Sequence, residues 1–192
     1  MACRALIPPL LKNGVAFEAH AQNVLARFDV VTKELRGFVI RDLGGLRIHP
    51  PTLRESTGVD FQFLSGHVVA TKDLGEIFSK FYHTFVHNHV QRLVRLLGMH
   101  HNGSGWSILR KHMSEVIPKE HQVWKVWMDP ASKTIESKSL IRMRMHGSYR
   151  DVSVFLHFGS FNSLTCYQII FTPLPNLIQY QPQENLDLQL PH

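Results

Sequence analysis

The chain has 192 residues, of which 44% are hydrophobic and 19% are charged, and its formal net charge at pH 7 is +6. These values fit one globular domain with a buried core and exclude the composition of a disordered chain. No run approaches the roughly 18 apolar residues that a membrane-spanning helix needs, and the opening residues do not match a secretory signal, so we expect a cytoplasmic protein with no membrane partner.

The basic, cysteine and histidine residues argue against three further classes of protein. The 21 Lys and Arg residues are scattered and not clustered with aromatic side chains, so no nucleic-acid partner is predicted. Only Cys3 and Cys166 are present, and one chain therefore supplies neither a disulfide framework nor a four-cysteine cluster. The 13 histidines form no HExxH pattern, which does not favour a zinc site. The histidines expected to lie on the surface or pack within helices are His87, His89, His100 and His101.

A short helix is predicted at the beginning of the chain. Residues 3–13 carry apolar side chains at helical spacing. Pro8 and Pro9 lack the amide hydrogen that a helix interior uses, so we expect the helical stripe to be broken there. Gly14 follows, and glycine is the residue that most often ends a helix.

Two strands and a turn come next. Residues 24–30 alternate between apolar and polar side chains, residues 38–40 are apolar, and the segment TKELRG between them predicts a turn. The strands should therefore pair as a hairpin. The polar residues before the first strand and Asp42 after the second would then lie at the same end of that hairpin.

This end of the hairpin is the candidate site, because two carboxylates, amide side chains and basic residues would meet there. Hard oxygen ligands of this kind suit Mg²⁺, which proteins usually bind through one or two carboxylates together with substrate phosphates. Protein kinases arrange a loop asparagine and a later hairpin aspartate in the same order for the same purpose. The residues of the candidate site are Glu18, His20, Gln22, Asn23, Arg41, Asp42 and Arg47.

The later part of the chain is predicted to be mainly helical. Apolar residues recur at spacings of three and four over residues 77–97, and residues 107–117 predict another amphipathic helix. Residues 121–129 predict a short helix or an extended segment, and residues 139–146 predict a strand. The tail, residues 151–192, ends in a stretch rich in Pro, Gln and Asn and is expected to lack fixed structure.

The order of these elements predicts an α+β fold, in which a β-hairpin or small antiparallel sheet is followed by a block of helices. We expect one domain over residues 1–150, followed by the poorly ordered tail.

The segment FEAHAQNVLARFDVVTKELRGFVIRDLGGLRI, residues 17–48, resembles the signature region of the NRPS-independent siderophore synthetases of the IucA/IucC type. In that family an E-x-H-x-Q-N loop is followed by a hairpin and then by R-D-x-x-G. The downstream helices and the segment SLIRMRMHG are also similar to the family's carboxyl-terminal part. The resemblance covers about residues 1–150.

The resemblance implies a palm-and-thumb fold that is distantly similar to kinases, a possible homodimer, and a ligase that uses ATP and Mg²⁺. The enzyme would adenylate a carboxylate of citrate or a related acid, and an amine or hydroxyl group of the second substrate would then displace AMP. Such a reaction brings polyanions together and needs positive charge placed in advance. The implied roles are metal binding for Glu18 and Asp42, cofactor binding for Gln22, Asn23 and Arg47, and catalysis for His20 and Arg41.

Two departures from the family pattern bear on activity. The family's amino-terminal motif G-x-H-P-x-H-P-x-x-K, which grips the ATP phosphates, does not occur in the chain, so we expect a carboxyl-terminal part that is a poor enzyme alone. Residues 153–168 also intervene between segments similar to the family's GSYRDV and IIFTPLPN. We hypothesise that they are an insertion from imperfect gene prediction, which sequencing of the transcript tests.

Two other interpretations remain open. A kinase-like phosphotransferase would use Asn23 and Asp42 on Mg²⁺, but it would also need a loop aspartate as base, where this chain has His20 and Gln22. A non-catalytic fragment or binding protein is the second interpretation. The same region is also related to ferric-siderophore reductases of the FhuF type, which need a cysteine-held cluster that two cysteines cannot supply.

Overall fold

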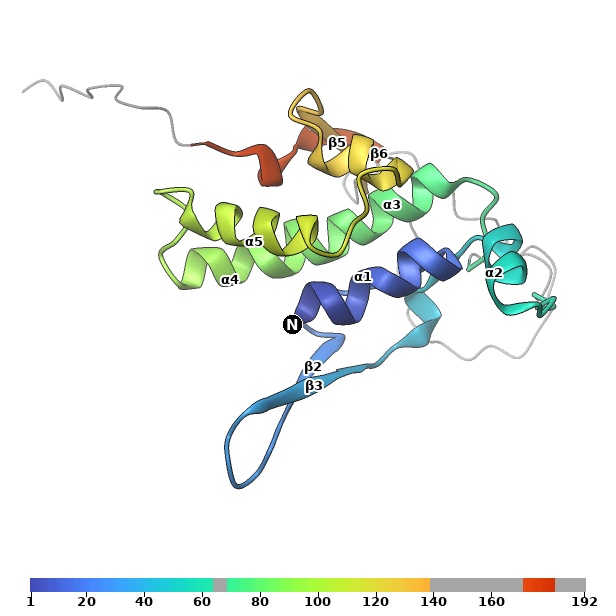
Figure 1. The fold of residues 1–192 in the computed structure, drawn as a ribbon, viewed down its shortest axis with the longest axis horizontal. Helices are drawn as coiled ribbons and strands as arrows, with labels where there is room; N and C mark the ends of the chain where they lie inside the picture. The colour runs from blue at the N-terminus through green and yellow to red at the C-terminus, as the bar shows by residue number, and fades with distance from the viewer. Residues whose placement is uncertain (64–68, 139–170, 182–192) are drawn as a thin grey trace, which may run out of the picture.

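The computed structural model describes residues 1–63, 69–138 and 171–181, and their fold is α+β, as the sequence predicts. The described strands form three separate two-stranded antiparallel sheets. In Figure 1 the hairpin of β2 (Val24–Phe28) and β3 (Leu35–Ile40) projects from one side of the helices. The pair of β5 (Thr134–Lys138) and β6 (Phe171–Pro175) lies on the other side. The expected hairpin does precede the helical block, and a further antiparallel sheet, which was not expected, follows that block.

The first helix, α1 (Ala2–Asn13), is continuous, and the expected break at the two prolines is wrong. The amide hydrogens that Pro8 and Pro9 lack would have bonded the carbonyls of Arg4 and Ala5, which are exposed residues, so water can take their place. Gly14 ends the helix at a φ of 63°, in the left-handed region, as predicted. Burial of one apolar face outweighs the lost bonds, and that face consists of Cys3, Leu6, Ile7 and Leu10.

The predicted hairpin is confirmed. Strand β2 (Val24–Phe28) pairs with β3 (Leu35–Ile40), and Val24 lies opposite Ile40 at the open end. The first strand ends two residues before the predicted bound because Asp29 begins the turn. Its Oδ1 accepts hydrogen bonds of 2.9 Å from the amides of residues 31 and 32.

The helical block forms the core. One nearly continuous helical run consists of α3 (Leu74–Tyr82), the π-helical segment η2 (His83–Val90) and α4 (Gln91–Leu96), which confirms the predicted stripe. Helix α5 (Ser104–Ser114) and the short η3 (Trp124–Met128) follow. None of the helices in the described ranges is long and apolar enough to cross a membrane. The buried aromatic side chains at the centre are Phe78, Phe81, Tyr82, Phe85, Trp106 and Trp127.

Part of the tail is folded, which contradicts the expectation for residues 171–181. Strand β6 (Phe171–Pro175) pairs along its length with β5 (Thr134–Lys138), and the 3-10 turn η4 (Leu177–Gln179) follows. Ile178 is fully buried in the core. The rest of the tail, the predicted strand at 139–146 and the hypothesised insertion at 153–168 lie outside the described residues.

A buried asparagine fixes this C-terminal segment. The Tyr82 hydroxyl donates to Asn176 Oδ1 over 2.6 Å, and Asn176 Nδ2 donates to the carbonyls of Trp127 at 3.0 Å and Ser132 at 2.9 Å. The amide of Ile178 donates to the Tyr82 hydroxyl in turn. The composition of the tail suggested disorder. The buried side-chain amide of Asn176, whose oxygen and nitrogen both have hydrogen-bond partners, holds the segment in one position.

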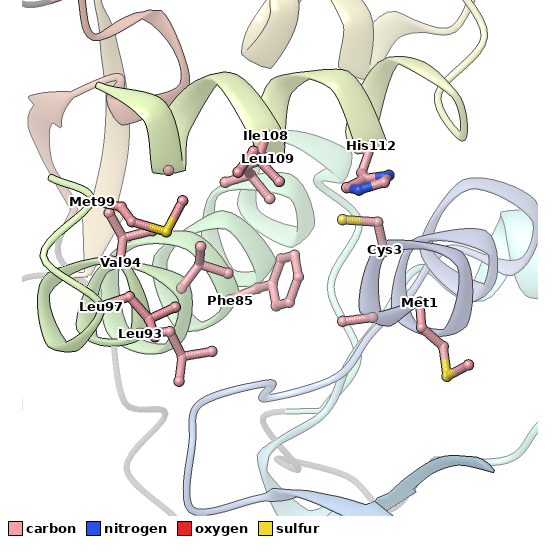
Figure 2. A pocket seen from close by; sticks show the side chains of 13 residues that line it. Met1, Cys3, Phe85, Leu93, Val94, Leu97, Met99, Ile108, Leu109 and His112 are labelled. Atoms are coloured by element: carbon pink, nitrogen blue, oxygen red, sulfur yellow. The ribbon is translucent and has the colours of Figure 1, made fainter. Parts of the chain in front are cut away.

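An apolar cavity of about 280 Å³ lies where α1, α4 and α5 diverge (Figure 2). Phe85, Leu93 and Leu109 line it, together with the thiol of Cys3, and His112 stands at its edge. Burial raises the pKa of the Cys3 thiol from 9.0 to about 11, so this thiol stays protonated and poorly nucleophilic at neutral pH. The lining offers no set of polar ligands, whereas polar side chains gather at the open end of the hairpin.

Candidate functional site

The loop of residues 18–23 folds back on itself between β1 (Val15–Ala16) and β2. The amide of His20 donates to the carbonyl of Glu18 at 3.0 Å, and the amides of Asn23 and Val24 both donate to the carbonyl of His20. Asn23 is only 3% exposed, and its Nδ2 donates to the carbonyl of Glu18 over 3.2 Å. The side chain of Asn23 therefore closes the loop from inside.

Two other elements hold the same loop from outside. At the end of β3, the Arg41 amide donates to the carbonyl of Asn23 at 3.0 Å, and Arg41 Nε donates to the carbonyl of Gln22 at 2.8 Å. From η2, His89 Nδ1 lies 3.1 Å from the carbonyl oxygen of Ala19. These contacts agree with the prediction that the polar loop and the residues after β3 share one end of the hairpin. The loop residues whose carbonyls accept hydrogen bonds are Glu18, Ala19, His20, Gln22 and Asn23.

Glu18 lies between a buried lysine and a glycine. Lys80 Nζ, on α3, is 3.1 Å from Glu18 Oε1, and the side-chain exposure is 4% for the lysine and 22% for the glutamate. A methyl group added at Gly45 would overlap Glu18 Oε2 and lie 2.8 Å from its Cδ. The glycine at the end of R-D-x-x-G, Gly45, therefore leaves the space that the Glu18 carboxylate occupies.

Asp42 lies beside the neighbouring glycine. It is exposed and has a φ of 60°, a left-handed conformation that Asp tolerates better than most residues. A methyl group at Gly44 would be 3.5 Å from Asp42 Oδ1, which is ordinary contact. The carboxylates of Glu18 and Asp42 therefore lie beside consecutive glycines of the short turn η1 (Leu43–Gly45).

The carboxylates at this end of the hairpin suit a hard cation whose remaining ligands come from the substrate. Among the described residues no group of three or more His, Cys, Asp and Glu side chains is placed to hold a metal ion. Two carboxylates are nevertheless what Mg²⁺ commonly takes from a protein when phosphate oxygens provide further ligands. The arrangement is compatible with Mg²⁺ that arrives with a nucleotide, and it does not resemble an all-protein cage.

The two arginines of the predicted site have different surroundings. Arg41 is exposed, and its bond to Gln22 leaves the end of the guanidinium at the surface. Arg47, on β4 (Arg47–Ile48), is 6% exposed; its Nε donates to Glu76 Oε1 and its Nη1 to the carbonyl of Leu46, each over 3.2 Å. Arg41 is therefore the better placed of the two to meet an anion, and the cofactor-binding role of Arg47 stays a prediction.

Sequence reasoning missed Lys80 and His89. The signal for Lys80 was available, because a lysine three residues after Ile77 falls on the apolar face of the helix and a buried lysine needs a partner. His89 was expected to be a surface or packing residue. Its contact with the loop depends on the π-helical geometry of η2, which periodicity does not predict.

Comparisons with known proteins identify a family and several relatives of this chain. A family model described as "Ferric iron reductase FhuF-like transporter" matches residues 2–151. The NRPS-independent siderophore synthetase rfs of Rhizopus delemar is 43% identical over 182 residues, which are 95% of this chain and 26% of the relative. D-ornithine–citrate ligase of Staphylococcus aureus is 32% identical over 114 residues, 58% of this chain and 16% of the relative.

A solved structure supports the fold. The petrobactin biosynthesis protein AsbB from Bacillus anthracis matches with a TM-score of 0.61 over 91% of this chain and 28% of its own length, at 16% sequence identity. At that identity the likeness concerns the fold alone. The chain spans about a quarter or less of the length of the curated relatives named above.

Proposed function

Because this chain belongs to the FhuF-like family, and its relatives are NRPS-independent siderophore synthetases, we propose that it forms the carboxyl-terminal catalytic region of an ATP-dependent ligase. The ligase would join a citrate-like carboxylate to an amine in siderophore biosynthesis. The observation that carries the proposal is the loop of residues 18–23, whose backbone is held on three sides and whose carboxylate and amide groups lie at the open end of the hairpin.

ATP and Mg²⁺ are the proposed cofactors. Glu18 and Asp42 would hold the metal together with phosphate oxygens of the nucleotide. Gln22 would help to place the phosphates, and Asn23 would do so by closing the loop from inside. When bound, the ion supplies positive charge that offsets charge developing on the phosphates. Lys80 lies beside Glu18 and neutralises part of its charge, so the site is not left with an excess of negative charge when no nucleotide is bound.

The proposed reaction has two steps. An oxygen of the acid's carboxylate attacks the α-phosphorus of ATP, and the bond from that phosphorus to the bridging oxygen breaks, so that pyrophosphate leaves with the electron pair. The amine nitrogen then attacks the acyl carbon, AMP leaves with the electrons of the carbon–oxygen bond, and the nitrogen loses a proton. His20 and Arg41 would contact the carboxylate and the transferring phosphate, where preplaced donors stabilise developing negative charge.

Citrate is the proposed acid because a relative is a D-ornithine–citrate ligase. The same relative suggests an amine of the amino-acid type as second substrate. A citrate carboxylate carries negative charge and would be attracted to the exposed guanidinium of Arg41.

The family description also names a ferric iron reductase, and the cysteine content of this chain does not favour that function. A cluster held by four cysteines needs four thiolates, and the chain has two cysteines. Of these, Cys3 is buried in the apolar cavity with a raised pKa. A kinase-like phosphotransferase is distinguished by its products, since it would release ADP and a phosphorylated acceptor.

The test uses the purified chain with ATP, Mg²⁺, citrate and hydroxylamine. We expect Mg·ATP binding by calorimetry and a slow release of AMP and pyrophosphate with formation of a hydroxamate, because the chain lacks the motif that grips the ATP phosphates in the family. Asp42→Asn should weaken Mg·ATP binding about tenfold or more, the loss of one metal contact, whereas Asp60→Asn, at an exposed aspartate paired with Arg54, should not. ADP as the product would overturn the adenylation, and equal binding by both variants would overturn the assigned metal site.

A further inference from the structure

We propose that His89 is a positioning residue of the candidate site, whose imidazole holds the carbonyl of Ala19 and thereby fixes the backbone that carries His20. The inference rests on the proposed function in one respect, because it gives His20 its catalytic importance. His89 lies seventy residues from Ala19 in the sequence and comes from a different element, so its contact ties the helical core to the loop.

The geometry specifies which ring nitrogen carries the proton. Nδ1 of His89 is 3.1 Å from the Ala19 oxygen, and a carbonyl oxygen can only accept a hydrogen bond. In the neutral ring Nδ1 therefore bears the hydrogen and Nε2 the lone pair. Ala19 itself is fully buried, so loss of the imidazole would deprive a buried residue's carbonyl of this donor.

The helix around His89 holds the ring in this position. The ring of Phe85 stands edge-on to it, with the centroids 6.2 Å apart and an angle of 89° between the planes. Both residues belong to η2, where the π-helical pattern shifts the following side chains relative to a regular α-helix. One extra residue in a turn rotates later positions by about 100° around the axis. This segment therefore directs His89 to the loop.

The surroundings of His89 favour the neutral form of its imidazole. Burial lowers its pKa, and the neighbouring His20 lowers it further, while the bond to Ala19 opposes both effects. The neutral ring can hold the carbonyl without adding a positive charge to the loop. A positioning role needs this hydrogen bond alone.

Two substitutions separate the hydrogen bond from simple packing. His89→Asn keeps a donor, because the amide Nδ2 takes roughly the place of the ring Nδ1, whereas His89→Leu keeps apolar volume and removes the donor. His87→Leu is the matched control: His87 is on the same segment, and its Nε2 contacts the carbonyl of Pro175 instead of the loop.

The first measurement is hydrogen exchange at the amides of Asn23 and Val24, which donate to the His20 carbonyl. We expect exchange about tenfold faster in His89→Leu, near wild-type exchange in His89→Asn, and no change at these amides in His87→Leu. Pyrophosphate release should follow the same order, with the loss in kcat. Equal exchange in the Asn and Leu variants, or unchanged exchange in His89→Leu, would overturn the inference.

These measurements distinguish a failure of the proposed function from a failure of the role proposed for His89. If the wild-type chain neither binds Mg·ATP nor releases pyrophosphate, the proposed function fails, and the exchange rates still decide whether His89 positions the loop. If the wild-type chain is active and His89→Leu retains wild-type exchange and kcat, only the role of His89 is rejected.

Discussion

Gly45→Ala should displace the carboxylate of Glu18 from its place beside Lys80. The new methyl group would overlap Glu18 Oε2 and come within 2.8 Å of Cδ and 3.0 Å of Cβ, so the side chain cannot keep its position by a small adjustment. Gly44→Ala is the control at the adjacent residue. Its methyl group would meet only Asp42 Oδ1, at 3.5 Å. Neither glycine has a positive φ, so backbone strain does not distinguish the two variants.

The size of the effect follows from the ion pair. Removing the partner of a fully buried charge costs about 3–5 kcal/mol. Lys80 is 4% exposed, but Glu18 is 22% exposed and can still be partly solvated after it moves, so we expect Gly45→Ala to lower the free energy of unfolding by about 2 kcal/mol. Gly44→Ala should change it by less than about 0.5 kcal/mol.

Urea denaturation of the two variants measures this difference, and calorimetry with Mg·ATP measures its consequence for binding. We expect Gly45→Ala to bind the nucleotide about tenfold more weakly than Gly44→Ala, because the displaced carboxylate is a proposed metal ligand. If the two variants unfold at free energies within about 0.5 kcal/mol of each other, the spatial argument for Gly45 is wrong.

Three further predictions concern the core. Asn176→Ala should lower the free energy of unfolding by about 3 kcal/mol, measured by urea denaturation, because it leaves a buried hydroxyl without its acceptor; a loss below about 1 kcal/mol would contradict the described network. Cys3 should be alkylated about 100-fold more slowly at pH 8 in the native chain than in urea, because its pKa of about 11 keeps the native thiol protonated. The Cys166→Ser variant is used, so that Cys3 is the thiol that reacts. Equal alkylation rates in the native and unfolded chain would refute this expectation. Gly105→Ala should destabilise the chain by about 1–3 kcal/mol in thermal melts, because its methyl group would lie 2.6 Å from Val94 Cγ1, and Val94→Ala in the same chain should recover much of the loss.

The sequence predicted the elements whose determinants are local. The apolar stripe of the long helical run, the left-handed end of α1 at Gly14 and the hairpin all follow from patterns within a few residues. Prediction failed where distant contacts decide the structure. The prolines of α1 are tolerated because one face of that helix is buried, and the C-terminal segment folds because Asn176 meets partners 44 to 94 residues away.

The candidate site was predicted to a similar extent. The pattern E-x-H-x-Q-N, a hairpin and R-D-x-x-G indicated which polar residues would share one end, and the bonds of Arg41 to the loop agree with that placement. The pattern did not indicate what holds the loop from the helical side. Lys80 and His89 come from elements whose orientation depends on tertiary packing, and the π-helical segment alters the face on which His89 lies.

The pairing of β5 with β6 joins two segments that lie far apart in the sequence. Both strands are held, β5 by packing of the buried Ile135 in the core and β6 by the Asn176 network that follows it. A chain cut short before residue 171 would therefore lose both the strand that pairs with β5 and the acceptor of the Tyr82 hydroxyl.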